Sequence, residues 1–221
     1  VMETKTGHIK AISNLGRAND GSYYETQNYA ITESHEPGST FKLVDLIAVL
    51  DDKKADTSKI YDSKGGVIEY YGRKVRDSKP GGYGKISLAR GFELSSNTVL
   101  VQSVYDSYKN NPKQFVDRIN SYGLNKPLGL PIKGEGKPVI PQPGTNSWSG
   151  VALPWMAFGY GLSVTPLQTL TLYNAVANDG VMVKPIFVSE IKEWNKTIKK
   201  YNTEVINPKI CSQETLDKVQ A

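Results

Sequence analysis

The sequence predicts a mixed α/β protein of the α+β kind, with helices in the middle of the chain and antiparallel strands toward both ends. Three observations support this class. Residues 1–13 alternate polar and apolar side chains around a glycine turn, as β-hairpins do. Residues 41–50 place apolar side chains at helical spacing. Residues 181–194 and 197–206 have the pattern of two paired strands with a turn at Asn195-Lys196.

The N-terminal part of the chain, residues 1–32, is expected to hold the first strands of a sheet and a loop. Its hairpin turns at Lys5-Thr6-Gly7, where the glycine suits a tight turn. Residues 14–28 are polar and contain glycine, which predicts a loop. Residues 28–32 are expected to form a short strand.

A central helix is predicted next. Pro37-Gly38 blocks a helix before it, and Ser39 or Thr40 can occupy its first turn. Apolar side chains lie on nearly every face of this helix, so we expect it to be buried. The charged run Asp51-Asp52-Lys53-Lys54 is expected to end it in solvent.

The elements after this helix are shorter. Residues 65–77 predict a hairpin that turns at Gly72, and residues 79–84 predict a glycine-rich loop. Residues 123–150 are rich in glycine and proline and predict a long irregular excursion. Between them, two or three helices are expected, over residues 87–94, 97–108 and 112–122.

The last predicted helices have clear start signals. Thr165 is expected to cap a helix, with Pro166 as its first residue and Gln168 completing a capping box. This helix should stop at Gly180, which can adopt the left-handed conformation. After the strand pair, residues 212–221 predict the start of another helix.

The composition limits the kinds of function. Hydrophobic residues make up 38% and charged residues 22%, as in ordinary globular proteins. The net charge of +5 is scattered and forms no basic stripe with aromatics, so we expect no nucleic-acid partner. Two histidines argue against a histidine-rich metal site and against a Ser-His-Asp triad. The single cysteine, Cys211, is expected to fill space.

Ser39 and Lys42 are the first candidate catalytic pair. Ser-x-x-Lys places both side chains on one face of a helix, one turn apart. A serine hydroxyl is a weak nucleophile, and a neighbouring amine can take its proton if burial lowers the pKa of that amine. The alternative is a capping serine beside a solvated lysine. The apolar helix around Lys42 favours the catalytic interpretation, since a lysine in such a helix needs a reason.

Ser95 and Asn97 are the second candidates, in the run Ser95-Ser96-Asn97 about fifty residues further on. The alternative for this run is a linker between two helices, with Asn97 as a helix cap. Capping and a functional role can coexist in the same residue.

Together these motifs resemble those of the serine penicillin-recognising enzymes, which carry Ser-x-x-Lys, Ser-x-Asn and Lys-Thr/Ser-Gly. Glu36-Pro37-Gly38-Ser39-Thr40-Phe41-Lys42 is similar to the active-site block of class B penicillin-binding proteins. The run from Phe158 to Gln168, with Gly180 to Pro185, resembles the division-specific, penicillin-binding protein 3-like branch more than the elongation-specific one. The resemblance covers nearly the whole chain.

The resemblance implies a role for each candidate residue. Ser39 would attack the D-Ala–D-Ala carbonyl of a peptidoglycan stem peptide, or a β-lactam ring, and Lys42 would be the general base. Ser95 would relay a proton to the leaving group. Asn97 would bind the substrate amide and orient Lys42. The backbone N–H of Ser39 would form half of the oxyanion hole.

It also implies an architecture, a part of the serine β-lactamase/transpeptidase-like fold. Residues 1–221 would be one partial transpeptidase domain, in which a helical cluster packs against an incomplete antiparallel sheet. Residues 33–178 would form the helical active-site subdomain, with the loop at residues 123–150, and residues 179–221 the strand pair and the start of a helix.

The resemblance places the protein at the periplasmic face of the bacterial cytoplasmic membrane. The expected partners are peptidoglycan stem peptides, β-lactams and, in the intact protein, division-machinery proteins including a glycosyltransferase. No cofactor or metal is implied. No run reaches the roughly 20 apolar residues of a membrane span, so the membrane anchor is expected outside this sequence.

One motif departs from the family pattern. The third signature should follow residues 212–221, where this sequence ends, and the literal Lys5-Thr6-Gly7 is interpreted as a coincidental match in a hairpin turn. We therefore expect the 221-residue chain alone to be catalytically poor. The alternatives are a serine β-lactamase or D,D-carboxypeptidase, and a non-catalytic β-lactam sensor or division scaffold. Retention of Ser39, Lys42, Ser95 and Asn97 together speaks against the non-catalytic alternative.

Overall fold

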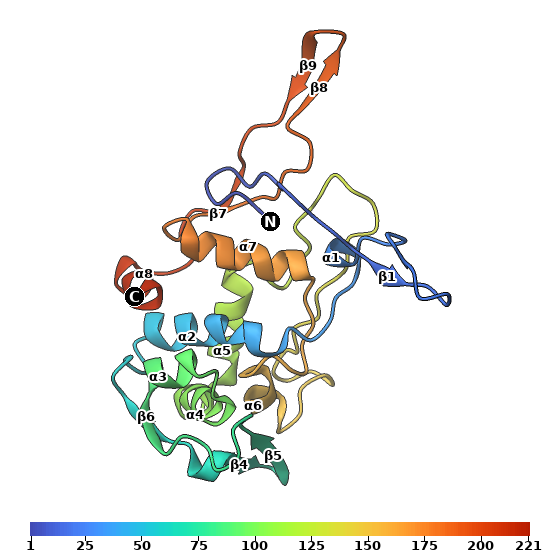
Figure 1. Ribbon diagram of the computed structural model, residues 1–221. Helices are drawn as coiled ribbons and strands as arrows, with labels where there is room; N and C mark the ends of the chain where they lie inside the picture. The colour runs from blue at the N-terminus through green and yellow to red at the C-terminus, as the bar shows by residue number, and fades with distance from the viewer.

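The strands of this protein form five separate antiparallel pairs, and the helices pack together beside them (Figure 1). The computed structural model describes residues 1–221. Its α-helices are α1 (Tyr29–Thr32), α2 (Lys42–Asp51), α3 (Leu88–Glu93), α4 (Asn97–Tyr108), α5 (Pro112–Ser121), α6 (Ala152–Met156), α7 (Pro166–Ala177) and α8 (Gln213–Gln220). Two short 3-10 helices are η1 (Gly38–Phe41) and η2 (Lys64–Gly66).

The paired strands are short. β1 (Gly16–Arg17) pairs with β2 (Tyr23–Tyr24), β3 (Ile60–Asp62) with β6 (Lys85–Ser87), β4 (Val67–Tyr70) with β5 (Arg73–Arg76), β7 (Met182–Val183) with β10 (Val205–Asn207), and β8 (Glu190–Glu193) with β9 (Lys196–Lys200). The mixed helix-and-strand class predicted from the sequence is confirmed, and the small pairs are consistent with a partial sheet.

Helix α2 is the centre of the core, as predicted. Every residue from Lys42 to Leu50 is buried, with α4, α5 and α8 packed around the helix. The expectation that the run from Asp51 to Lys54 ends this helix in solvent is partly met: the helix ends at Asp51 and both lysines are exposed, but Asp51 and Asp52 are partly buried. Arg118 of α5 donates to both carboxylates, at 2.9 Å for Asp51, and Tyr108 donates to Asp52 at 2.8 Å. The end of α2 therefore packs against α5, because Arg118 of α5 neutralises its two carboxylates.

The helices after the first hairpins are confirmed, with one correction to a cap. Ser96 caps α4, because its hydroxyl accepts from the N–H of Val99 at 3.2 Å, and Asn97 is the first helical residue. At the start of α7, Thr165 and Gln168 form the predicted capping box. These starts follow local sequence because a cap satisfies N–H groups within three residues of itself.

The strand predicted at residues 28–32 is wrong, because this segment is the short helix α1. The carbonyl of Asn28 accepts from the N–H groups of Ile31 and Thr32. The side chain of Asn14 accepts from the N–H of Ala30 at 3.0 Å. One donor of the helix start is thus satisfied by a residue far back in the chain, which local spacing does not reveal.

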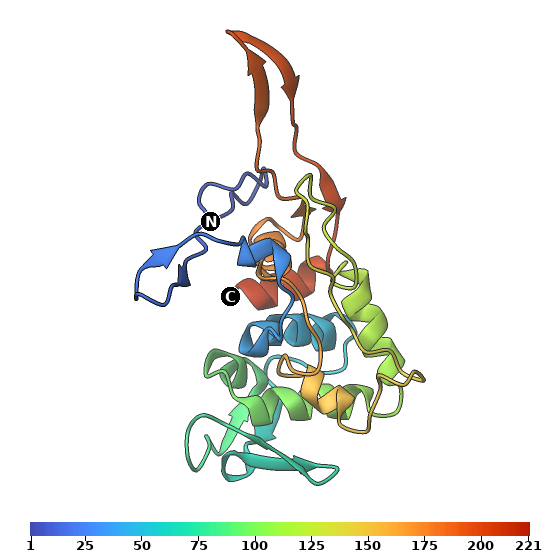
Figure 2. The same cartoon turned by 90° about the vertical axis from the view of Figure 1, so that its right-hand side faces the viewer.

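The strand predictions at the chain ends are only partly met. The first hairpin makes a single bridge, Met2–Ile9. The predicted strands 181–194 and 197–206 are each broken in two, and their turn occupies Trp194-Asn195, one residue earlier than expected. The β8–β9 hairpin extends away from the body of the molecule, with every strand residue exposed (Figure 2).

The other loops lie as predicted, with three additions. Residues 123–150 contain no helix or named strand, and the β4–β5 hairpin turns at Tyr71-Gly72. The sequence did not predict helix α6, the β3–β6 pair or the small β1–β2 pair inside the first loop. None of the helices has the length and apolar character needed to cross a bilayer.

Candidate active site

Ser39 lies in η1, immediately before the buried helix α2, and is exposed. Gly38 has a φ of 56°, so the chain turns sharply before it enters the helix. The hydroxyl of Thr40 donates to the carbonyl of Pro37 at 2.8 Å and closes this turn. The sequence thus places a small nucleophile at a surface turn whose next residues are fixed in the core.

Lys42 connects two hydroxyl groups that are far apart in the sequence. Its Nζ lies 3.2 Å from Ser39 Oγ, 2.9 Å from Ser95 Oγ and 2.6 Å from the Ser95 carbonyl oxygen. Lys42 is only 2% exposed, whereas both serines are exposed. The structure therefore brings three of the four candidate residues together, with the amine below two hydroxyls that face solvent.

The surroundings of Lys42 suit a base. Burial lowers the pKa of Lys42 to about 8, although the carboxylates of Asp45 and Asp77 act in the opposite direction. An amine with such a pKa is partly unprotonated near neutral pH. Since Ser39 Oγ is within hydrogen-bonding reach, the free amine can accept its proton.

Ser95 reaches Lys42 from the turn between α3 and α4. Its φ of 53° is in the left-handed region, which few residues other than glycine adopt. Its own N–H donates to the carbonyl of Phe92 at 2.9 Å. Both oxygens of Ser95 contact Lys42 from this conformation. Strained backbone of this kind costs about 1 kcal/mol or more and often marks a functional site.

Asn97 stands apart from the other three candidates. Its Nδ2 donates to the Arg76 carbonyl at 2.6 Å, and it makes no hydrogen bond to Lys42. The neighbouring Asp77 accepts from Ser96 Oγ at 3.1 Å and from the N–H and hydroxyl of Thr98, at 2.9 and 2.8 Å. These bonds tie the end of β5 to the start of α4.

Asp77 and Glu36 also contribute to the site, although the sequence motifs predict no role for either side chain. Asp77 places a negative charge near Lys42. Glu36 accepts from the N–H of Gly161 at 2.8 Å. Beside this bond, His35 and Val164 exchange two backbone hydrogen bonds of 3.1 Å. The only feature of the sequence that points to the contact between Glu36 and Gly161 is that both residues lie in motifs shared with the family.

Gly159 fixes the position of the nucleophile turn. Its carbonyl accepts from the N–H of Gly38 at 3.0 Å. A Cβ at position 159 would lie 2.0 Å from the Gly38 carbonyl oxygen, and the φ of Gly159 is +83°. Only glycine fits both conditions. The block around Gly159 therefore braces the residue that precedes Ser39.

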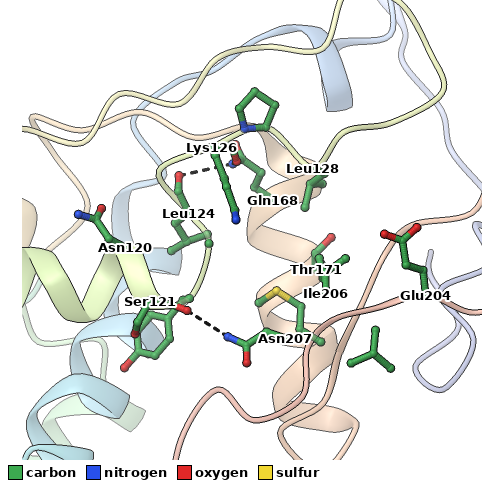
Figure 3. A pocket seen from close by; sticks show the side chains of 15 residues that line it. Asn120, Ser121, Leu124, Lys126, Leu128, Gln168, Thr171, Glu204, Ile206 and Asn207 are labelled. Carbon is green, nitrogen blue, oxygen red and sulfur yellow. Dashed lines mark hydrogen bonds between the residues drawn. The ribbon is translucent and has the colours of Figure 1, made fainter.

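A separate hollow of about 510 Å³ lies between the end of α5, α7 and β10 (Figure 3). Gln168 donates to the carbonyls of Leu124 and Lys126, and Asn207 donates to the carbonyl of Ser121. None of the four candidate residues lines this hollow. Its polar side chains brace the backbone around it, so the candidate chemistry is at Ser39.

The literal Lys5-Thr6-Gly7 has a structural explanation in the first hairpin turn. A Cβ on Gly7 would lie 2.3 Å from the Lys184 carbonyl oxygen, and the Gly7 carbonyl accepts from Ile186 at 2.8 Å. The glycine is required where the turn packs on the segment after β7. This supports the interpretation of the tripeptide as a coincidental match.

Comparison with known proteins gives consistent matches. All 221 residues match the family model described as the penicillin binding protein transpeptidase domain. The chain is 30% identical over 194 residues to PbpB of Mycobacterium tuberculosis, covering 84% of this chain and 27% of PbpB. It is 26% identical over 198 residues to the peptidoglycan D,D-transpeptidase FtsI of Escherichia coli K12, covering 86% and 32%.

A solved structure agrees. Penicillin binding protein 3 of Mycobacterium tuberculosis in complex with ampicillin matches with a TM-score of 0.79 and 25% identity, covering 98% of this chain and 48% of that one. The chain thus spans about a third of the curated relatives, 27% and 32% of their lengths.

Proposed function

Because this chain belongs to the penicillin-binding protein transpeptidase family, we propose that it carries the acylation machinery of a peptidoglycan D,D-transpeptidase. The resemblance to the class B, penicillin-binding protein 3-like branch is confirmed. One observation carries the proposal: the buried amine of Lys42 lies within hydrogen-bonding distance of the exposed hydroxyls of Ser39 and Ser95. This arrangement suits the activation of a serine nucleophile by a lysine base.

The first step is acylation of Ser39. Ser39 Oγ forms a bond to the carbonyl carbon of the penultimate D-Ala, and its proton passes to Lys42 Nζ. The negative oxygen of the tetrahedral intermediate accepts from the Ser39 N–H. The bond to the terminal D-Ala nitrogen then breaks, and this nitrogen receives the proton from Lys42 through Ser95 Oγ. The terminal D-Ala leaves as a free amino acid.

The second step transfers the acyl group. An amine of a neighbouring stem peptide attacks the Ser39 ester, which forms the cross-link and returns the proton to Ser39. Asn97 binds the donor peptide in this proposal. Since its Nδ2 donates to Arg76 in this structure, the carbonyl oxygen of Asn97 is the atom that would accept from the substrate amide.

The same nucleophile would open a β-lactam ring, because the strained lactam carbonyl occupies the place of the D-Ala–D-Ala carbonyl. The match to penicillin binding protein 3 in complex with ampicillin supports this part of the proposal.

The proposed reaction supports a location in the cell envelope, and the family resemblance supports the proposed partners. Peptidoglycan is a polymer of the cell envelope, so we place the protein there, at the periplasmic face of the cytoplasmic membrane. We further propose a membrane anchor outside the 221 residues and division-machinery partners, including a glycosyltransferase. Within the chain, we propose that residues 33–178 form the active-site part, with residues 1–32 and 179–221 as sheet-forming flanks.

The decisive experiment is labelling of the full-length protein with a fluorescent penicillin, followed by mass spectrometry of the labelled peptide. We expect one stable adduct on Ser39 and none in Ser39→Ala. Label on another residue, or none on the folded wild type, would refute the assignment. Rapid loss of the label would instead indicate a β-lactamase.

A further inference from the structure

Asp45 is a buried acid that the proposed reaction does not use. It is completely buried, and neither of its carboxyl oxygens has a hydrogen-bond partner. Buried polar groups are nearly always hydrogen-bonded, and each exception requires an explanation. Asp45 lies three residues after Lys42 in α2, so the two side chains are neighbours on the helix surface.

The groups around Asp45 leave Lys42 as its counter-charge. On another helix, burial and then the charge of Asp45 raise the pKa of Tyr173 of α7, whose hydroxyl donates to the Thr40 carbonyl at 2.9 Å. Burial raises the pKa of Asp45 well above its usual range, and Lys42 acts in the opposite direction. An ionised Asp45 is therefore stable chiefly while Lys42 is protonated.

Lys42 depends on Asp45 in the same way. Its three acceptors, on Ser39 and Ser95, are uncharged oxygens. The other nearby carboxylate, Asp77, already accepts hydrogen bonds from Ser96 and Thr98. Asp45 is thus the one nearby carboxylate that no hydrogen bond satisfies.

We propose that Asp45 is a positioning residue that acts through Lys42: its carboxylate stabilises the ammonium form and so sets the pH range in which Lys42 can accept the proton of Ser39. The inference rests on the proposed role of Lys42 as the base. When Asp45 is ionised, Lys42 holds its proton more tightly, and acylation requires a higher pH. Without this charge, Lys42 would become a free amine at lower pH.

The test is the pH profile of Ser39 acylation in the full-length protein, with Asp45→Asn and Asp45→Glu compared against wild type. The acid limb is the part of the profile in which the acylation rate rises with pH. In Asp45→Asn this limb should lie about one pH unit lower, so that acylation at a pH below the wild-type limb is about tenfold faster than in wild type. Asp45→Glu keeps the charge and should retain the wild-type limb. A purely structural role would change the melting temperature without moving the limb.

The outcomes separate the two proposals. Coincident limbs in wild type and folded Asp45→Asn would overturn the role of Asp45. Absence of Ser39 acylation in wild type at every pH would instead overturn the proposed function. If Asp45→Asn does not fold, carbon-13 NMR of aspartate-labelled wild type decides. We expect the Asp45 signal to be that of an ionised carboxylate below the acylation limb and to shift at the limb as Lys42 loses its proton, whereas a carboxyl that stays protonated across this pH range would refute the inference.

Discussion

Replacing Gly159 with alanine should impair acylation without touching any reacting group. The added Cβ would lie 2.0 Å from the Gly38 carbonyl oxygen, whereas real contacts of this kind are essentially never below 3.0 Å. The gap must open by about 1 Å, and Gly38 is bonded directly to Ser39. A displacement of about 1 Å at a reacting group can cost about 100-fold in rate. We expect a loss of about that size in Gly159→Ala.

Gly123→Ala is the matched control for backbone strain. Gly123 has a φ of +80°, close to the +83° of Gly159, but a Cβ there would meet nothing within 4 Å. Both variants should lose about 1 kcal/mol of stability from the left-handed conformation. Only Gly159→Ala should also move the nucleophile.

The assay is the second-order rate constant for labelling by a fluorescent penicillin, measured on both variants alongside their urea unfolding. If folded Gly159→Ala labels within a few-fold of Gly123→Ala, the proposed brace on the nucleophile turn is refuted. A loss of label that follows the unfolded fraction would also count against it, because the reasoning requires a folded protein with a displaced Ser39.

Three further predictions follow from the structure. The rate of acylation should rise with pH and level off above about 8, since Lys42 must lose its proton to act as the base. A rate that falls as the pH rises toward 8 would contradict this prediction. Arg118→Ala should lower the free energy of unfolding, measured in urea, by about 2 kcal/mol, because it leaves Asp52 buried without its cation. This value lies between those of exposed and buried ion pairs. Lys113→Ala, which breaks an exposed pair, should change the free energy of unfolding little. Thr165→Ala removes the cap of α7 and should cost about 1 kcal/mol, measured as a lower melting temperature.

The sequence predicted best where the determining contacts are local. The capping box at Thr165 lies within four residues, and the apolar spacing of residues 41–50 reports directly on burial. Predictions failed where a distant residue supplied the partner. Asn14 supports α1, and Arg118 holds the end of α2 in the packing. Both partners are too far along the chain to be found from the sequence next to α1 or to the end of α2.

The candidate site shows the same division. Ser39 and Lys42 are recognisable because one helical turn sets their spacing, and Ser95 because it belongs to a short motif. No sequence pattern predicts the roles of Asp77, Glu36 and Asp45. Their roles depend on the folded arrangement. Asp77 accepts from an N–H at the start of α4, and Glu36 accepts from the distant N–H of Gly161. Asp45 is buried without a hydrogen-bond partner.

The bond between Glu36 and the Gly161 N–H joins residues 125 positions apart, and Lys42 reaches Ser95 across 53 positions. Helix α2 can form from local contacts. The turn that presents Ser39 also requires the 125-residue loop between Glu36 and Gly161 to close, and the entropic cost of this closure precedes the contacts that offset it. Reactivity at Ser39 is therefore a measure of long-range folding. During refolding, the helical circular dichroism signal should return before the capacity to take up penicillin.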